Sequence, residues 1–238
     1  MTNPEVFNLP AGPVGMLVGF EYRQESYTDD RDPRLDGQIQ FTSTETGLGF
    51  PFVGDVLGSS PTVDTSAKRS TNSVFAEMIL PISSKMEAQV AMRHEDPDDT
   101  KSSTVWKAAL GWEISDDLLL RGSKSTSFRV PNLIQANQLY VTRSGNVDDA
   151  VGEYVGGDPL DDRYQIQSFR RGNPNLLPEE SDNTSWGIVW TPSAIEGLTI
   201  TWDDWRIEKD NTIVLFGRTN SMVADLVACL LYTSDAAD

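Results

Sequence analysis

Two stretches of this chain carry the strongest structural signal: LLLRGSKSTSFRVPNLIQ at Leu118–Gln135 and GNPNLLPEESDNTSWGIVWTP at Gly172–Pro192. In each of them apolar and polar side chains alternate over part of the stretch, which is the pattern of a β-strand with two different faces. In the first stretch, Pro131 restricts Val130 to extended backbone geometry. We therefore expect the chain to leave that strand without continuing into a helix.

Together the two stretches resemble TonB-dependent outer-membrane receptors. In that family a strand ending in a Ser-x-Gly-Phe-Arg-Ala-Pro type motif leads into a long loop, which a Gly-Asn-Pro-x-Leu-x-Pro-Glu motif closes. The first motif is matched by Phe128, Arg129 and Pro131, whereas Ser127 and Val130 replace the usual Gly and Ala. The second is matched by Asn173, Pro174, Leu176, Pro178 and Glu179. Neither replacement alters the backbone geometry that the motif requires.

Alternation along the rest of the chain predicts an all-β fold, an antiparallel meander of about seven strands. The predicted strands are Val14–Tyr27, Ser73–Ile82, Met86–Glu95, Ser102–Ile114, Leu118–Phe128, Ser181–Thr191 and Gly197–Glu208. The resemblance implies that residues 1–228 are part of a transmembrane barrel of about 22 strands. The plug domain, the TonB box and the final strands are then missing from it.

The predicted connections alternate between short turns and long insertions, of which the longest are residues 28–72 and 129–180. Outer-membrane barrels have short periplasmic turns and longer extracellular loops. We therefore expect the long insertions on the extracellular side, either as functional surface loops or as disordered segments.

Composition excludes several partners. The net charge of -17 argues against nucleic acid, because phosphate binding needs clustered Lys and Arg, and against a polybasic membrane-surface mode. No apolar run is long enough for a transmembrane helix. Alternating barrel strands are half polar, so the hydrophobic content of 38% remains compatible with a membrane β-barrel.

Alternation also assigns faces to side chains. We expect the charged set Glu87, Arg93, Lys107 and Arg121 to face the lumen. We expect the aromatic set Trp106, Trp112, Trp186 and Trp190 to face lipid, because amphipathic rings favour the membrane interface. The alternative is that the tryptophans fill the core of a soluble β-sandwich.

The resemblance further implies that Arg129, Pro131, Asn173 and Glu179 lie at the outer mouth, close to plug and ligand. The alternative for each of them is that it only shapes the entry or exit of a long loop.

The sequence gives little support for a catalytic site or a metal site. His94 precedes Glu95, Asp96, Asp98 and Asp99, but carboxylate-rich hairpin tips are usually only solvated. The stretch DDRDPRLDG at Asp29–Gly37 lacks the glutamate of a calcium loop. No nucleophile motif accompanies the lone histidine, and the single cysteine, Cys229, rules out an internal disulfide. We predict no enzyme, no cofactor and no metal site.

The resemblance implies a receptor that takes up a scarce ligand, such as a ferric siderophore, vitamin B12 or an oligosaccharide. Its partners are then outer-membrane lipid and the TonB complex, which acts through the missing N-terminal region. A non-energised porin or adhesin, or a secreted β-rich carbohydrate-binding module or enzyme, remains an alternative.

The two ends of the chain suggest that it is a fragment. No signal peptide opens it, so we expect the true start upstream. CLLYTSDAAD at residues 229–238 resembles a translated sequencing adapter, and we expect this tail to be non-native.

Overall fold

The computed structural model describes residues 2–3, 6–42, 44–47, 49–53, 60–148, 163–215, 217, 220–221, 223–224 and 227–228. The chain divides into two compact units, of which the first comprises residues 1–26, 68–132 and 174–213. The second comprises residues 27–67, 133–173 and 214–238. The tail at residues 229–238 lies outside the described residues.

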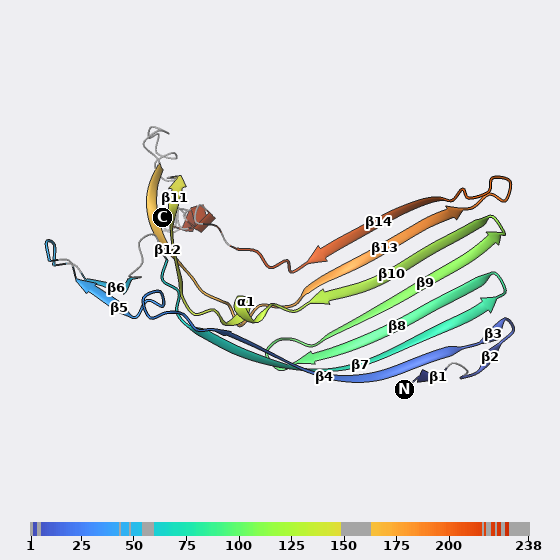
Figure 1. Ribbon diagram of the computed structural model, residues 1–238, viewed down its shortest axis with the longest axis horizontal. Helices are drawn as coiled ribbons and strands as arrows, with labels where there is room; N and C mark the ends of the chain where they lie inside the picture. Colours follow the sequence, from blue (N-terminus) through green and yellow to red (C-terminus); the bar gives the residue numbers. More distant parts are fainter. Residues whose placement is uncertain are drawn as a thin grey trace, which may run out of the picture. The chain divides into compact units, whose positions relative to one another are not determined.

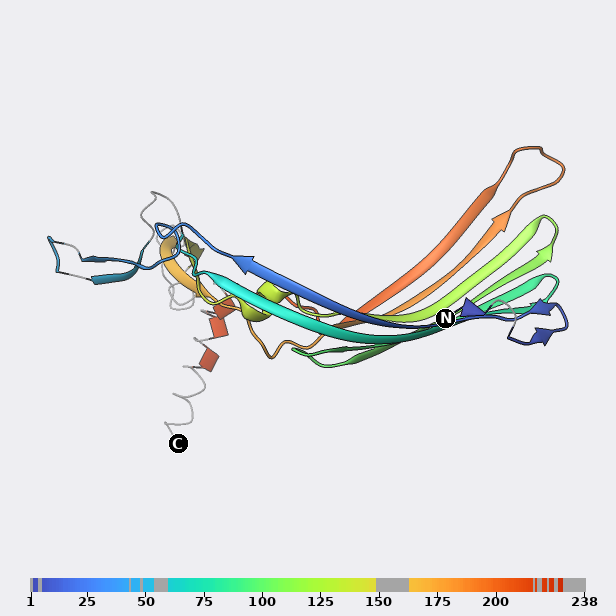
Figure 2. The ribbon, with the colours of Figure 1, turned by 60° about the horizontal axis from the view of Figure 1, so that its bottom comes forward.

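An eight-stranded sheet dominates the first unit, with strand order β1-β4-β7-β8-β9-β10-β13-β14 (Figure 1). Seven of its strands are long: β4 (Gly15–Asp29), β7 (Thr65–Ser83), β8 (Met86–Pro97), β9 (Ser103–Ser115), β10 (Leu118–Arg129), β13 (Glu179–Trp190) and β14 (Ile200–Asp210). The short β1 (Thr2–Asn3) pairs with β4 at one edge, and β2 (Asn8–Leu9) and β3 (Gly12–Pro13) form a small hairpin. Figure 2 shows that the sheet is curved but not closed. The predicted all-β meander of about seven strands is therefore confirmed.

The strand register gives every long strand the same two faces. One row of paired residues runs from Glu87 through Gly111, Arg121 and Gly187 to Asp203. Because successive side chains in a strand point to opposite sides, odd-numbered residues of the long strands share one face and even-numbered residues share the other. The odd face carries most of the charged side chains, and the even face carries most of the apolar ones.

One strand boundary differs clearly from the prediction. β7 begins at Thr65, so the last eight residues of the segment predicted as loop 28–72 belong to a strand. These residues, TSAKRSTN, are polar on both faces and show no alternation of hydropathy. Backbone pairing and buried polar contacts hold them in place instead, since Thr65, Arg69 and Thr71 are all buried.

The second unit is built from the long connections, which are more regular than a structureless loop. The connection between β4 and β7 contains the hairpin of β5 (Ile39–Thr42) and β6 (Gly49–Val53). The connection between β10 and β13 contains α1 (Leu133–Asn137) and the antiparallel pair of β11 (Val141–Asp148) and β12 (Arg163–Arg170). As the position of Pro131 predicts, α1 starts only after the strand has ended.

Few apolar side chains are buried among the described residues: Val14, Leu133, Ala136 and Val147. The large apolar side chains of the sheet are exposed instead, and each of its tryptophans exposes more than two fifths of its surface. They do not fill the interior of a sandwich in this structure. No helix in the described part of the chain is long and apolar enough to cross a membrane.

Candidate functional site

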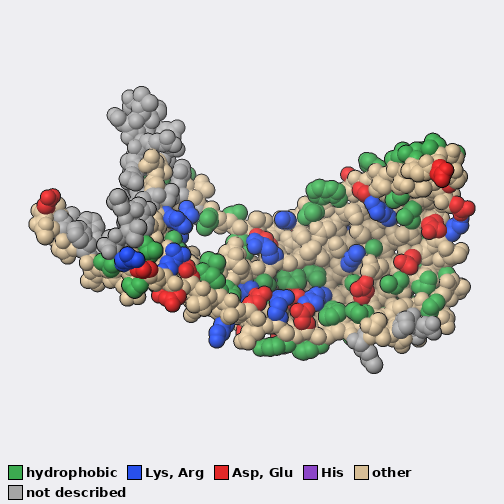
Figure 3. Space-filling view, viewed as in Figure 1, with side chains coloured by type: hydrophobic (Ala, Val, Ile, Leu, Met, Phe, Trp, Pro, Cys, Tyr) green, Lys and Arg blue, Asp and Glu red, His purple; other side chains and the backbone are tan. Residues whose placement is uncertain are grey.

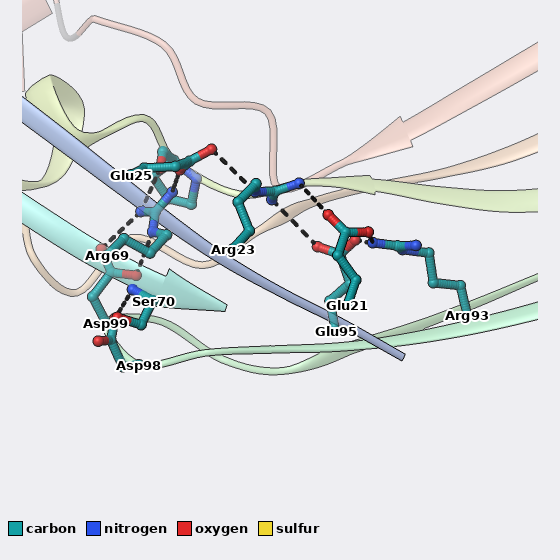
Figure 4. Close-up of polar contacts among 10 residues, drawn as sticks. Glu21, Arg23, Glu25, Arg69, Ser70, Arg93, Glu95, Asp98 and Asp99 are labelled. Carbon is teal, nitrogen blue, oxygen red and sulfur yellow. Dashed lines mark hydrogen bonds and ion pairs between the residues drawn. The ribbon is translucent and has the colours of Figure 1, made fainter. Parts of the chain in front are cut away.

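A network of charged side chains extends over the odd face of β4, β7 and β8 (Figure 4). Its best-buried member is Arg69, which is 2% exposed. Arg69 donates to both carboxylate oxygens of Asp99, at 2.6 and 2.8 Å, and to the carbonyl oxygen of Pro131 at 2.7 Å. A buried guanidinium is tolerated only when its donors are satisfied in this way. Arg69 thereby holds the corner that follows β10.

The network continues along the same face through Arg93. Arg93 donates to Glu21 at 2.8 Å and to Glu95 at 2.6 Å, and its guanidinium lies 5.3 Å from the centre of the Phe75 ring. Arg23 lies 3.9 Å from Glu95. Figure 3 looks onto a face on which acidic and basic side chains lie close together. Of this network, only Arg93 was among the predicted site residues.

Farther along the odd face, Glu87, Lys107 and Arg121 line a hollow of about 270 Å³. Arg121 reaches across Gly187 on β13 to Asp203 on β14, and its closest contact is 2.7 Å. A Cβ at Gly187 would lie 2.0 Å from Oδ1 of Asp203, so the ion pair requires a glycine between its partners. The structure thus places all four charged residues predicted to face the lumen on one face of the sheet.

The two sequence motifs meet through an ion pair. Arg129, the last residue of β10, donates to Glu179, the first residue of β13, at 2.7 Å. The other carboxylate oxygen of Glu179 accepts the backbone N–H of Ile213, which follows β14, at 2.7 Å. Glu179 therefore joins three chain segments at one end of the sheet.

The remaining parts of the motifs meet within the second unit. The backbone N–H of Gly172 donates to the carbonyl oxygen of Gln138 at 2.7 Å, and that of Asn173 donates to Gln135 at 2.9 Å. A Cβ at Gly172 would lie 2.8 Å from backbone atoms of Ala136 and Gln138. The glycine that opens the second motif is thus packed against the segment that follows the first.

The predicted lipid-facing tryptophans share the even face. Trp106 and Trp112 lie on β9, and Trp186 and Trp190 lie on β13. Trp186 also makes an edge-to-face contact with Trp202 of β14, with ring centres 4.6 Å apart. These exposed aromatic side chains belong to the same sheet surface as the other apolar side chains.

Among the described residues, no group of three or more His, Cys, Asp or Glu is arranged to hold a metal ion. Nδ1 of His94 lies 2.8 Å from Oγ1 of Thr104, and Asp98 accepts the backbone N–H of Ser70. In the calcium-like stretch, Asp32 accepts from the Arg34 side chain, and this hydrogen bond lowers the pKa of the Asp32 carboxyl. The acidic groups thus bind protein donors.

Two short turns are joined by an ion pair: Lys85, between β7 and β8, donates to Asp116, between β9 and β10, at 2.8 Å. This hydrogen bond lowers the pKa of the Asp116 carboxyl and raises that of the Lys85 ammonium group.

Sequence reasoning missed Arg69 and Glu25, and it did not foresee that Arg121 pairs with Asp203. Arg69 could have been found by extending the predicted strand toward its N-terminal end. It is separated from Phe75 by an even number of residues, so both side chains lie on the same face of β7. Its partner Asp99 lies in a connection between strands, so only the folded chain identifies it.

Comparison with known proteins agrees with this architecture. The family model "TonB dependent receptor-like, beta-barrel" matches residues 3–233. The siderophore receptor PirA from Acinetobacter baumannii has a similar structure, with 18% identity and a TM-score of 0.58 over 85% of this chain. The G324V mutant of the ferric enterobactin receptor PfeA from Pseudomonas aeruginosa shows 19% identity and a TM-score of 0.59 over 87% of the chain.

PirA from Pseudomonas aeruginosa gives 16% identity and a TM-score of 0.55 over 83% of the chain. The matched region is 25%, 25% and 29% of the three solved chains, so this chain spans roughly a quarter of their length. At such identities the likeness concerns the fold. The family match covers nearly the whole sequence, and it shows that the chain belongs to the TonB-dependent receptor β-barrels of the outer membrane.

Proposed function

We propose that this chain is a later part of the barrel of a receptor that imports a ferric siderophore, with energy relayed by TonB from the inner membrane. In this proposal residues 1–228 are the barrel segment and residues 229–238 are a non-native tail. The plug domain and the region that contacts TonB belong to parts of the receptor outside this chain. The observation that carries the proposal is the division of one sheet into a charged face and an apolar face.

The charged face suits a water-filled or plugged lumen. Glu87, Arg93, Lys107 and Arg121 all belong to it, together with the network around Arg69. Charged side chains on a lipid-facing surface are destabilising, whereas the interior of such barrels is polar. We therefore assign the odd face to the lumen and the even face, with Trp106, Trp112, Trp186 and Trp190, to lipid.

The boundary of the apolar band supports this assignment. One outward row of paired residues is apolar across β7, β8 and β9 and then polar: Met78, Val90, Ala108, Lys124, Thr184 and Arg206. The next row toward the short turns loses its apolar character only on β14: Leu80, Ala88, Leu110, Gly122, Trp186 and Asp204. A third row has Ser83 on β7 and is apolar from β8 to β14: Met86, Trp112, Leu120, Ile188 and Trp202.

Such a stepwise boundary is expected when rows of paired residues are inclined to the membrane plane. Barrel strands tilt by about 35–45°, so the rows cannot run parallel to the edge of the bilayer. Counted from the short turns toward the long connections, the apolar band then ends earliest on β14 and latest on β7. Lys124 lies just beyond its edge, where a long cationic side chain reaches the headgroups.

The ligand class rests on the solved structures that share this fold, which are siderophore and ferric enterobactin receptors by their own descriptions. Arg129, Pro131, Asn173 and Glu179 are proposed to shape the mouth through which the ligand enters. Vitamin B12 and oligosaccharides are the alternative ligands that the test below distinguishes from a siderophore.

The test uses the complete gene that contains this segment, recovered by a long sequencing read through the parent DNA. We expect a strain that lacks the gene to lose growth on chelated medium with its siderophore as iron source, and the gene to restore it. Uptake should stop when TonB is removed.

Uptake that persists without TonB would support a non-energised porin. Growth defects limited to vitamin B12 or to an oligosaccharide would change the ligand class. Native start and stop codons around these residues would exclude the fragment proposal.

A further inference from the structure

The connection between β8 and β9, residues 98–102, is anchored to β7 at its first residue. The backbone N–H of Asp98 donates to the carbonyl oxygen of Ser70 at 3.0 Å, and a side-chain oxygen of Asp98 accepts the backbone N–H of Ser70 at 3.1 Å. Strand pairing between β7 and β8 continues up to Pro97. The two residues that follow Asp98 therefore extend from a fixed point of the first unit.

The first of them, Asp99, is connected to the first sequence motif through Arg69 (Figure 4). Nε and Nη2 of Arg69 donate to the two carboxylate oxygens of Asp99, and Nη2 also donates to the carbonyl oxygen of Pro131. Nη1 lies 3.9 Å from the carboxylate of Glu25. Arg69 and Pro131 are both fully buried, so the loss of one acceptor would leave a buried charge poorly compensated. The position of Pro131 thus depends on Asp99.

The second of them, Thr100, is connected to the second sequence motif. Its Oγ1 donates to the carbonyl oxygen of Leu176 at 3.2 Å. Leu176 lies shortly before β13, which begins at Glu179. Two adjacent residues of one short connection therefore reach the segment just after β10 and the segment just before β13.

These contacts lie where the pairing of β10 with β13 has already ended. The last paired residues are Arg129 and Glu179. Beyond them, the chain leaves the first unit after Asn132 and returns to it at Pro174. Every residue that is left unfixed retains conformational entropy, so the ends of this long connection need support beyond the last strand pair. Asp99, through Arg69, and Thr100 supply it.

Resting on the proposed function, we infer that Arg69, Asp99 and Thr100 form a clamp that holds both ends of the connection between β10 and β13 in the conformation that binds a ferric siderophore. Arg69 is a positioning residue, because it acts through Pro131, which is proposed to shape the mouth. When the clamp opens, fewer receptors have the binding conformation, and the apparent affinity falls with that fraction.

The first measurement is hydrogen exchange of the full-length receptor in detergent, followed by mass spectrometry. The reporters are peptides that contain the backbone amides of Gln138, Gly172 and Asn173, which are all hydrogen-bonded within this connection. Their exchange rates report how often the connection opens locally. This measurement uses no ligand, so it tests the clamp separately from the proposed function.

Three variants alter the clamp and one is a matched control. Asp99→Asn removes the negative charge that Arg69 faces, and Thr100→Val removes the hydroxyl group that reaches Leu176. Thr100→Ser retains that hydroxyl group and serves as the rescue. The control is Asp203→Asn, because Asp203 also binds one arginine through both carboxylate oxygens but lies within the paired part of β14. Heat-modifiable migration of each variant checks that the barrel has formed.

We expect Asp99→Asn to raise the exchange rates of the reporter amides by about tenfold or more, because a hydrogen bond between charged groups is weakened. Thr100→Val should raise them by about fivefold, as expected for one neutral hydrogen bond. Thr100→Ser and Asp203→Asn should leave them unchanged. Unchanged exchange in both Asp99→Asn and Thr100→Val, or an equal rise in Asp203→Asn, would overturn the inference.

The second measurement is binding of ferric enterobactin, detected by quenching of tryptophan fluorescence. Arg69→Gln removes the charge–charge pair with Asp99 and should weaken binding by about tenfold or more. Full affinity in a folded Arg69→Gln receptor would show that the clamped conformation is not the one that binds, and would overturn the inference. If the unaltered receptor does not bind ferric enterobactin, that result counts against the proposed ligand class, and the exchange rates still decide whether the clamp exists.

Discussion

At the scale of single residues, Glu179 of the second motif connects three segments of the chain. Its carboxylate pairs with Arg129 and also accepts the backbone N–H of Ile213. The ion pair by itself contributes little, because Arg129 is about half exposed and exposed pairs are worth about 0.2–1 kcal/mol. The hydrogen bond to Ile213 matters more, since it fixes the chain after β14.

We predict that Glu179→Gln costs about 1 kcal/mol of unfolding free energy, because the amide oxygen can still accept from Ile213. Glu179→Ala should cost about 2–3 kcal/mol, because it leaves both donors unpaired. Urea unfolding of the full-length receptor in lipid vesicles measures both values. The control is Glu180→Gln, an exposed glutamate on the opposite face. An equal cost at both positions would contradict this role for Glu179.

A second residue-scale feature is the gap at Gly187, across which Arg121 reaches Asp203. We predict that Gly187→Ala destabilises the receptor by about 1–3 kcal/mol, as expected for an added methyl group in a tightly packed position. Gly111 lies beside Arg121 on the other neighbouring strand, where an added Cβ meets nothing within 4 Å. The same unfolding assay should therefore find Gly111→Ala nearly neutral. If the two substitutions cost the same, steric conflict with Asp203 is not the cause.

At the scale of elements, β9 has a charged odd face and an apolar even face, so neighbouring residues of this strand should respond oppositely to a new charge. Leu110 lies on the even face of β9 and is 42% exposed, while the adjacent Ala109 lies on the odd face. In the proposed orientation, Leu110 meets lipid and Ala109 meets the lumen.

We predict that Leu110→Arg destabilises the full-length receptor in vesicles by roughly 2–4 kcal/mol if the residue lies at mid-bilayer. Ala109→Arg should cost markedly less. A reversed order of the two unfolding free energies would mean that the lipid and lumen faces have been exchanged.

At the scale of the whole molecule, the sheet has two open edges. All eleven residues of β14 are exposed, and at the opposite edge, within the described part of the chain, β4 has only the two residues of β1 beside it. Unpaired backbone groups are costly in lipid, because no water is present to satisfy them.

We therefore predict that the 238-residue chain alone does not form a stable closed barrel. After refolding into detergent, electrophoresis of unheated and heated samples should show no shift in migration, whereas the full-length receptor should show one. A discrete heat-modifiable species from the chain alone would mean that its edges pair with each other or with a second copy.

The sequence by itself determined the seven long strands of the sheet, their order and the two faces on which their side chains lie. Side chains alternate with period two along a strand, so hydropathy was sufficient to group Glu87 with Arg121 and Trp106 with Trp186. The short turns and the extended exit of the chain from β10 at Val130 followed from local backbone preferences. The family motifs identified the barrel.

Only the tertiary structure decided the contacts between distant segments. The start of β7 at Thr65 escaped prediction because its first residues are polar on both faces and are held by long-range hydrogen bonds. The bridging role of Glu179 and the reach of Arg121 across Gly187 depend on strand register, which no single strand encodes. Within the second unit, the bridge between Thr62 and Val141 forms only where two long connections meet. Alternation is a property of one strand, whereas these features require several strands to come together.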